Sequence, residues 1–255
     1  MELERSSETY QEEIVIEALD VHKHYDTGKV TVKALQGVTL RIHRKEVVAI
    51  MGPSGCGKTT LLNCLSGLDQ VTSGTVKIEN QDIRRLSDRQ LTLFRAREMG
   101  FVFQTYNLLP VLTGLENVEL PLLVGGVSSR EARRRALAGI ERVGLRDWAS
   151  HRPAEMSGGQ RQRFAIARAL ATTPSIVWAD EPTGALDSTT SQEIIDLMLT
   201  LNRELGLTFV WVTHALDIAR QASRMITMAD GLIKEDVPLE VQTSIDTFEE
   251  KGAQR

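Results

Sequence analysis

Apolar and polar residues follow two different patterns along this chain. Over residues 14–50 they alternate in short runs around a turn at 26–29, which predicts several antiparallel strands. Residues 73–78 predict a further strand, a turn follows at 79–82, and the apolar run 101–103 is expected to be a short buried strand. The first part of the chain is therefore expected to be rich in β structure.

The second pattern is helical and then alternates strand with helix. From about residue 115 to 163 the spacing predicts helices, including the arginine-rich stretch 130–135. That stretch is expected to be a solvated helix face, with binding of a partner or of lipid headgroups as the alternative. Further on, strands are expected at 175–179, 208–213 and 225–228, and helices over 192–205 and from Ala215. This alternation predicts a parallel sheet covered on both faces.

Composition and charge narrow the class of protein. A chain of 255 residues can bury a large core, and its net charge of −4 argues against a nucleic-acid binder driven by bulk positive charge. No uncharged apolar run approaches the roughly 20 residues that span a bilayer, so a membrane role is expected only through a partner. The acidic first residues do not resemble a secretory signal, and export is not expected. The two cysteines form no disulfide framework, which fits a reducing cytosol.

A glycine-rich loop directly follows the apolar run 47–51. It reads Gly52, Pro53, Ser54, Gly55, Cys56, Gly57, Lys58 and Thr59, and Thr60 begins a helix-like segment. A strand, such a loop and a helix in this order form a nucleoside triphosphate site, because backbone N–H groups and the positive end of the helix bind phosphates. Lys58 is expected to reach the β and γ phosphates, and Thr59 to ligate Mg²⁺. Cys56 is expected to be a small residue tolerated in the loop, with a reactive thiol as the alternative.

Two carboxylates, Asp180 and Glu181, end the expected buried strand at 175–179. Ligands of open α/β sheets bind at the carboxyl ends of the strands, so both acids are expected at the triphosphate site. Asp180 is expected to hold Mg²⁺, directly or through water, while Glu181 polarises a water for attack on the γ phosphate.

One further motif identifies a family. Ser157, Gly158, Gly159 and Gln160 precede the helical run 161–170, and with this signature the sequence resembles the ATP-binding cassette (ABC) family over about residues 14–233. The resemblance implies an α/β fold: a P-loop NTPase (RecA-like) core with a parallel sheet, an N-terminal antiparallel β subdomain, and a helical subdomain at roughly 105–163. It implies one ATPase domain over 14–235, an acidic extension at 1–13 and a polar tail at 236–255.

The resemblance also assigns roles to single residues. Tyr25 matches the aromatic that stacks on adenine, and Gln104 matches the lid glutamine, which also serves the metal site. Asp180 and Glu181 match the metal-binding acid and the general base, Asp187 the aspartate of the following loop, and His214 the switch histidine. Taken by themselves, Tyr25 and His214 are also compatible with ordinary surface positions. Gly184 departs from the serine that many cassettes carry there.

The signature suggests how the protein assembles. Residues 157–160 lie at an expected helix N-terminus, where two glycines allow close backbone approach, so they form a second anion site apart from the phosphate loop. In the family, two cassettes pair head to tail and each ATP is sandwiched between one phosphate loop and the other signature. The resemblance therefore implies a homodimer that binds ATP and Mg²⁺, with Lys58, Glu181 and His214 as catalytic residues.

Segments 101–110 and 116–122 resemble the ATPase subunits of the lipoprotein-releasing, macrolide-exporting and antimicrobial-peptide-resistance systems. The resemblance implies a hydrolytic subunit at the cytoplasmic face of the inner membrane, peripheral to it. Its partner is expected to be an integral-membrane permease on a separate chain, and no nucleic acid is expected. An importer ATPase, or a soluble cassette acting on nucleic acid or ribosomes, remains an alternative.

Overall fold

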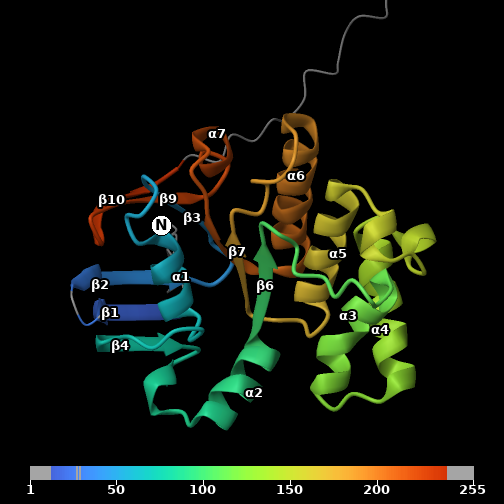
Figure 1. Cartoon of the computed structure of the whole chain (residues 1–255), viewed down its shortest axis with the longest axis horizontal. Coiled ribbons are helices and arrows are strands. Elements are labelled where there is room, and N and C mark those ends of the chain that lie inside the picture. The colour runs from blue at the N-terminus through green and yellow to red at the C-terminus, as the bar shows by residue number, and fades with distance from the viewer. Residues whose placement is uncertain (1–12, 27, 29, 240–255) are drawn as a thin grey trace, which may run out of the picture.

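Two β-sheets and the helices around them make up the computed structural model, which describes residues 13–26, 28 and 30–239 (Figure 1). The predicted N-terminal extension, except Glu13, and the tail from residue 240 lie outside the described residues, as do positions 27 and 29 of the predicted turn. No helix in the described part is long and apolar enough to cross a bilayer.

The smaller sheet is antiparallel in all its pairs and has the strand order β2-β1-β4-β5. Its strands are β1 (Ile14–Asp26), β2 (Thr31–His43), β4 (Ser73–Ile78) and β5 (Gln81–Asp82). The buried side chains of β1 and β2 come from the part of the sequence in which apolar and polar residues alternate. The predicted antiparallel subdomain is confirmed. One part of that prediction is wrong, because the run at 47–51 belongs to the other sheet and pairs parallel.

The larger sheet has the order β10-β9-β3-β8-β7-β6. Its strands are β3 (Val47–Met51), β6 (Met99–Phe103), β7 (Ile176–Asp180), β8 (Thr208–Val212), β9 (Arg224–Ala229) and β10 (Leu232–Pro238). All neighbouring pairs are parallel except β9 and β10. Strand β10 runs three residues beyond the predicted domain end at 235. Its last five residues are exposed at the sheet edge, so no apolar pattern marks them.

Helices cover both faces of this sheet and extend beyond one side of it. They are α1 (Lys58–Leu65), α2 (Asp88–Glu98), α3 (Gly114–Val124), α4 (Ser129–Arg142), α5 (Gly158–Leu170), α6 (Ser188–Leu205) and α7 (Leu216–Ala219). Helix α2 has no counterpart among the predicted elements, since only Phe94 of its residues is buried. The helix expected from Ala215 is only four residues long.

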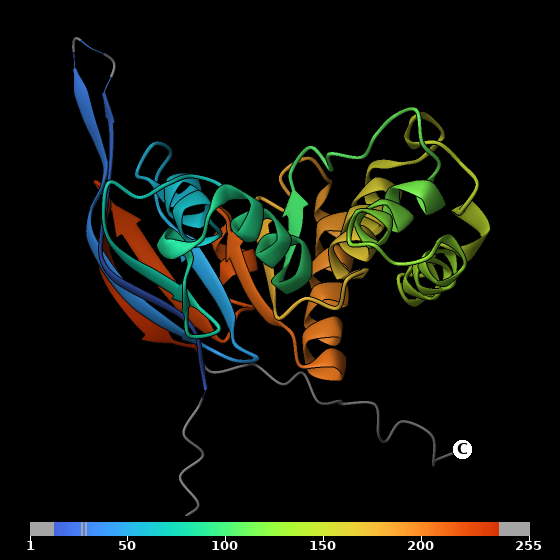
Figure 2. The same ribbon diagram turned by 90° about the horizontal axis from the view of Figure 1, so that it is seen from below.

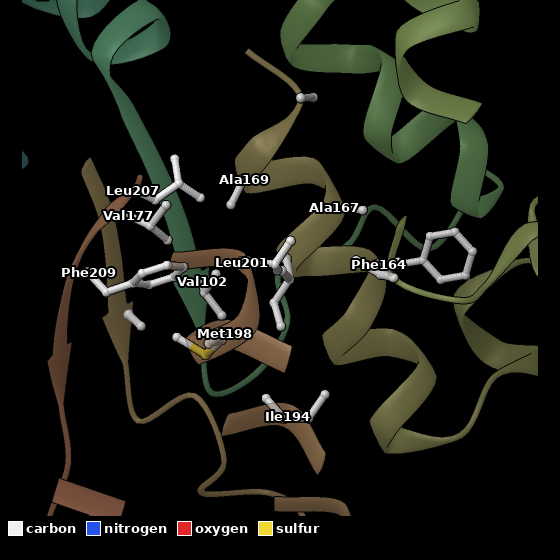
Figure 3. Packing of buried hydrophobic residues seen from close by; sticks show 14 of the residues in the cluster. Val102, Phe164, Ala167, Ala169, Val177, Ile194, Met198, Leu201, Leu207 and Phe209 are labelled. Atoms are coloured by element: carbon white, nitrogen blue, oxygen red, sulfur yellow. The ribbon is translucent and has the colours of Figure 1, made fainter. Parts of the chain in front are cut away.

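Successive residues of the central strands point to opposite faces and build two cores. Ala49 and Trp211 pack in one core, with the helical side of the molecule, whereas Ile50 and Val210 pack in the other, with α1 and the small sheet. Figure 3 shows part of the first core, in which Met198 and Leu201 of α6 lie among strand and α5 side chains. The predicted sheet with both faces covered is therefore confirmed.

Helices α3 and α4 lie together on the side of the molecule away from the small sheet, with α5 reaching back to the core (Figures 1 and 2). Helix α5 crosses the expected boundary at residue 163. The arginine stretch lies in α4, where Glu131 pairs with Arg134 at 2.6 Å and with Arg135 at 2.7 Å, and all three are at least partly exposed. This arrangement agrees with a solvated helix face.

Candidate nucleotide site

The loop between β3 and α1 takes a backbone conformation that depends on glycine. Gly52, Gly55 and Gly57 all have positive φ, of 152°, 79° and 104°. A Cβ at Gly52 would lie 2.3 Å from the carbonyl oxygen of Met228, and one at Gly57 would lie 2.5 Å from that of Ala34. The loop is thus held close against the strands beside it, and the first turn of α1 opens from it.

Lys58 is the first residue of α1, and its side chain turns back over the loop. Its Nζ donates to the carbonyl oxygens of Gly52, at 2.7 Å, and of Pro53, at 3.0 Å. An ammonium group beside a helix N-terminus, with loop N–H groups around it, forms a site for a polyanion.

Thr59 brings the loop into contact with the end of β7. Its Oγ1 donates to Asp180 Oδ1 at 3.2 Å. Burial raises the pKa of Asp180, and the neighbouring Glu181 charge raises it further, while the bond from Thr59 opposes both. A hydroxyl and a carboxylate this close together are oxygen ligands of the kind that Mg²⁺ takes beside phosphates, so the donor set fits a magnesium ion.

Glu181 and His214 face each other from neighbouring strand ends. His214 Nδ1 lies 2.8 Å from Glu181 Oε1, and the Glu181 side chain is 20% exposed. The Glu181 backbone has φ of +48°, a conformation that costs energy in a residue other than glycine, and its N–H donates to Val212. This local strain is of the kind that occurs at functional sites.

Lys58, Thr59, Glu181 and His214 border one cavity of about 710 Å³, while Asp180 lies behind Thr59 and outside the lining. Its lining includes the predicted residues Tyr25, Ser54, Gly55, Gly57, Lys58, Thr59, Thr60, Glu181 and His214. It also includes Val32, Lys33, Ala34, Gln36, Asp230 and Gly231, from β2 and the β9–β10 turn, which the sequence reasoning missed. The Asp230-Gly231 pair signals a hairpin turn, but no local signal places that turn beside the loop.

Other predicted residues lie outside the cavity lining. Gln104 lies against the segment after Glu181, since a Cβ at Gly184 would be 2.8 Å from Gln104 Nε2. Asp187 caps α6 by accepting from the Thr190 N–H at 3.0 Å, and bonds from Thr190 hold the pKa of Asp187 below its usual value.

The signature caps its own helix away from the cavity. Ser157 Oγ accepts from the Gln160 N–H at 3.2 Å, and Gln160 Oε1 accepts from the Ser157 N–H at 2.8 Å. A Cβ at Gly159 would lie 2.7 Å from Thr190 Cγ2, so the signature packs on the start of α6. The structure therefore brings the phosphate loop, Asp180, Glu181, His214 and Tyr25 to one region, and leaves residues 157–160 as a separate helix terminus.

Comparisons with known proteins identify the relatives of this chain. A family model described as ABC transporter matches residues 35–184. The lipoprotein-releasing system ATP-binding protein LolD of Pseudomonas fluorescens is 46% identical over 220 residues, which cover 86% of this chain and 97% of that protein. The macrolide export ATP-binding/permease protein MacB of Syntrophobacter fumaroxidans is 45% identical over 224 residues, which cover 87% of this chain and 31% of that protein.

A solved structure shares the fold closely. It is the dimeric structure of a post-hydrolysis state of the ATP-binding cassette MJ0796, from Methanocaldococcus jannaschii, bound to ADP and Pi. The TM-score is 0.82 at 45% identity, over 88% of this chain and 99% of that one.

Proposed function

The chain belongs to the family of ABC transporter ATP-binding subunits, whose cassettes bind and hydrolyse ATP, and from this premise we propose that it is the homodimeric ATPase of a transporter whose membrane-spanning subunit is another chain. The observation that carries the proposal is the 2.8 Å contact between His214 and Glu181 at the cavity that the phosphate loop borders. It supplies a carboxylate base and a partner that orients it.

Each residue of the cavity then has a task. Lys58 exchanges the carbonyl oxygens of Gly52 and Pro53 for phosphate oxygens, and the loop N–H groups bind the rest of the phosphate chain. Glu181 orients the attacking water and accepts its proton, while His214 holds the carboxylate in place. Tyr25, which also lines the cavity, stacks on the adenine ring.

Thr59 and Asp180 would hold Mg²⁺, with Gln104 approaching from the loop after β6. When bound, the ion neutralises charge that develops on the β and γ phosphates. The raised pKa of Asp180 fits this role, since burial disfavours the charged form of its carboxylate and a bound cation would favour it.

The position of the signature supports the dimer. Residues 157–160 form the N-terminus of α5, which is the positive end of that helix, outside the cavity of their own chain. In a head-to-tail pair, each signature would close over the ATP on the opposite phosphate loop, so that Ser157 and Gly159 act across the interface. The dimeric state of the MJ0796 cassette, a relative of this chain, favours this assembly.

The membrane partner is proposed to dock on the helical region. Apolar side chains are exposed on and before α3: Leu109, Val111, Leu120, Leu123 and Val124. Exposed apolar side chains favour contact with a protein partner over contact with water. LolD and MacB belong by name to lipoprotein-releasing and macrolide export systems. We place the dimer at the cytoplasmic face of the membrane, driving extrusion, lipoprotein release or mechanotransmission by a separate permease.

The enzymatic part of the proposal is tested with Glu181→Gln, which keeps the shape of the side chain and removes the base. Turnover should fall by about 10²- to 10⁴-fold while ATP still binds, because only proton transfer is lost. Unimpaired turnover would show that another group is the base.

Co-purification tests the partner. A subunit with a large extracytoplasmic domain supports the proposal, whereas a permease with a solute-binding protein, or ribosomes without a membrane protein, would support the alternatives.

A further inference from the structure

Lys23, Tyr25 and Asp69 form a hydrogen-bonded cluster at the edge of the cavity. Tyr25 Oη donates to Asp69 Oδ2 at 2.7 Å, and Lys23 Nζ donates to Asp69 Oδ1, also at 2.7 Å. The Lys23 ammonium lies 4.7 Å from the centre of the Tyr25 ring. One carboxylate thus binds both the hydroxyl of the ring and the cation beside it.

Asp69 is itself fixed to the helix that follows the phosphate loop. Its N–H donates to the carbonyl oxygen of Asn63 in α1 at 3.0 Å, and its Oδ1 accepts from the Gln70 N–H at 2.7 Å. The first turn of the same helix carries Thr60, which lines the cavity. Asp69 therefore connects the ring of Tyr25 to the element that begins at the phosphate site.

The cluster leaves part of the Tyr25 ring available. Lys23 and Tyr25 are two residues apart on β1, so they lie on the same face of the strand. The ammonium sits near the ring in a cation–π contact, and Tyr25 remains 39% exposed, in register with Val32 of β2, which also lines the cavity.

We propose that Asp69 is the positioning residue of the adenine site: it holds the Tyr25 ring at a fixed place relative to the phosphate loop, and Lys23 locks the carboxylate from its other side. This inference rests on the proposed function, in which Tyr25 stacks on the base. Burial alone would raise the pKa of Asp69, but the hydrogen bonds from Lys23 and Tyr25 keep it below its ordinary value. The carboxylate is therefore charged at neutral pH, and both bonds are charge-assisted.

A ring held in advance binds a base without first losing its own freedom of rotation. Without Asp69 the ring would turn about its side-chain bonds, and the ordering would oppose each binding event. Asp69 is not among the residues that line the cavity, so phosphate binding is expected not to depend on this contact. Base recognition and phosphate binding should therefore separate when the Asp69–Tyr25 bond is removed.

The test compares ATP with inorganic tripolyphosphate, which has the phosphates but no base, by calorimetry on the full chain. Asp69→Ala should weaken ATP binding by about five- to tenfold and leave tripolyphosphate binding unchanged, since the cost of ordering one side chain on binding corresponds to about that factor. It should also raise KM for ATP with little effect on kcat. The control is Asp147→Ala, an exposed carboxylate of the helical region.

Tyr25→Phe removes only the hydroxyl and keeps the ring, so it tests the same bond if Asp69→Ala does not fold. The ATP affinity of Tyr25→Phe should fall by a similar factor. A double variant that also carries Asp69→Ala should bind ATP only slightly more weakly than Tyr25→Phe alone. The inference is overturned if Asp69→Ala weakens ATP and tripolyphosphate equally, which would make Asp69 a support of α1 only, or if it weakens neither. A wild-type chain that fails to bind ATP at all would instead overturn the proposed function.

Discussion

Two glycines of the phosphate loop offer a matched pair for testing how the loop is held. Gly55 and Gly57 both have positive φ, so alanine at either position pays the same kind of backbone strain, about 1–2 kcal/mol. Their surroundings differ. A Cβ at Gly55 meets nothing within 4 Å, whereas a Cβ at Gly57 would lie 2.5 Å from the carbonyl oxygen of Ala34.

The expected magnitudes follow from this difference. Reduced freedom of the unfolded chain offsets part of the strain, by about 0.4–1 kcal/mol, so Gly55→Ala should lower the free energy of unfolding by roughly 1 kcal/mol. Gly57→Ala must in addition push the backbone of β2 away. Overpacking of this kind costs about 1–3 kcal/mol, so its total should be roughly 2–4 kcal/mol.

The assay is urea denaturation without nucleotide, so that contacts between the new methyl group and phosphate do not enter. Equal losses for Gly55→Ala and Gly57→Ala would refute the reasoning, because they would mean that the loop is not held against Ala34. A smaller loss for Gly57→Ala would refute it as well. ATP affinity, measured afterwards, should fall for Gly57→Ala by more than its loss of folding stability explains.

Three other outcomes are expected. The buried amide of Asn117 bonds the backbone of residues 109, 112 and 113, so Asn117→Ala should lower the free energy of unfolding by about 2–4 kcal/mol in a denaturant titration. The pKa of Asp180 is raised in the folded state, so its charged form opposes folding increasingly as the pH rises through its titration range. Asp180→Asn should therefore raise the melting temperature of the nucleotide-free protein at neutral pH, and this gain should shrink in acid. Mg²⁺-dependent turnover should be lost in the same variant. Burial raises the pKa of the Cys64 thiol to about 11. Mass spectrometry after brief iodoacetamide treatment should therefore find Cys64 unmodified in the native protein and modified after unfolding. Modification of Cys64 in the native state at neutral pH would contradict this prediction.

Elements that are largely buried have a clear apolar pattern and were predicted from the sequence. The central strands read as apolar runs because both of their faces are buried, and the phosphate loop was visible because glycines and Lys58 are adjacent along the chain. Helix α2 and strand β10 were not predicted, since both are mostly exposed and carry little apolar pattern.

Contacts between distant segments were the part that local patterns could not supply. Nothing in the sequence places Asp69 beside Tyr25, or the β9–β10 turn at the cavity, because these pairings depend on how the two sheets pack. The resemblance to a family assigned roles to Glu181 and His214, but the 2.8 Å contact between them came only from the structure.

Complementation between two inactive chains tests most directly the central claim, which is that each ATP site is shared between two copies. Lys58→Ala disables the phosphate loop and keeps the signature, whereas Ser157→Arg blocks the signature and keeps the loop. Each variant alone should hydrolyse little ATP. In a mixed dimer, the loop of one chain meets the intact signature of the other, so the mixture should hydrolyse ATP well above the sum of its two parents. Activity equal to that sum would contradict the shared site.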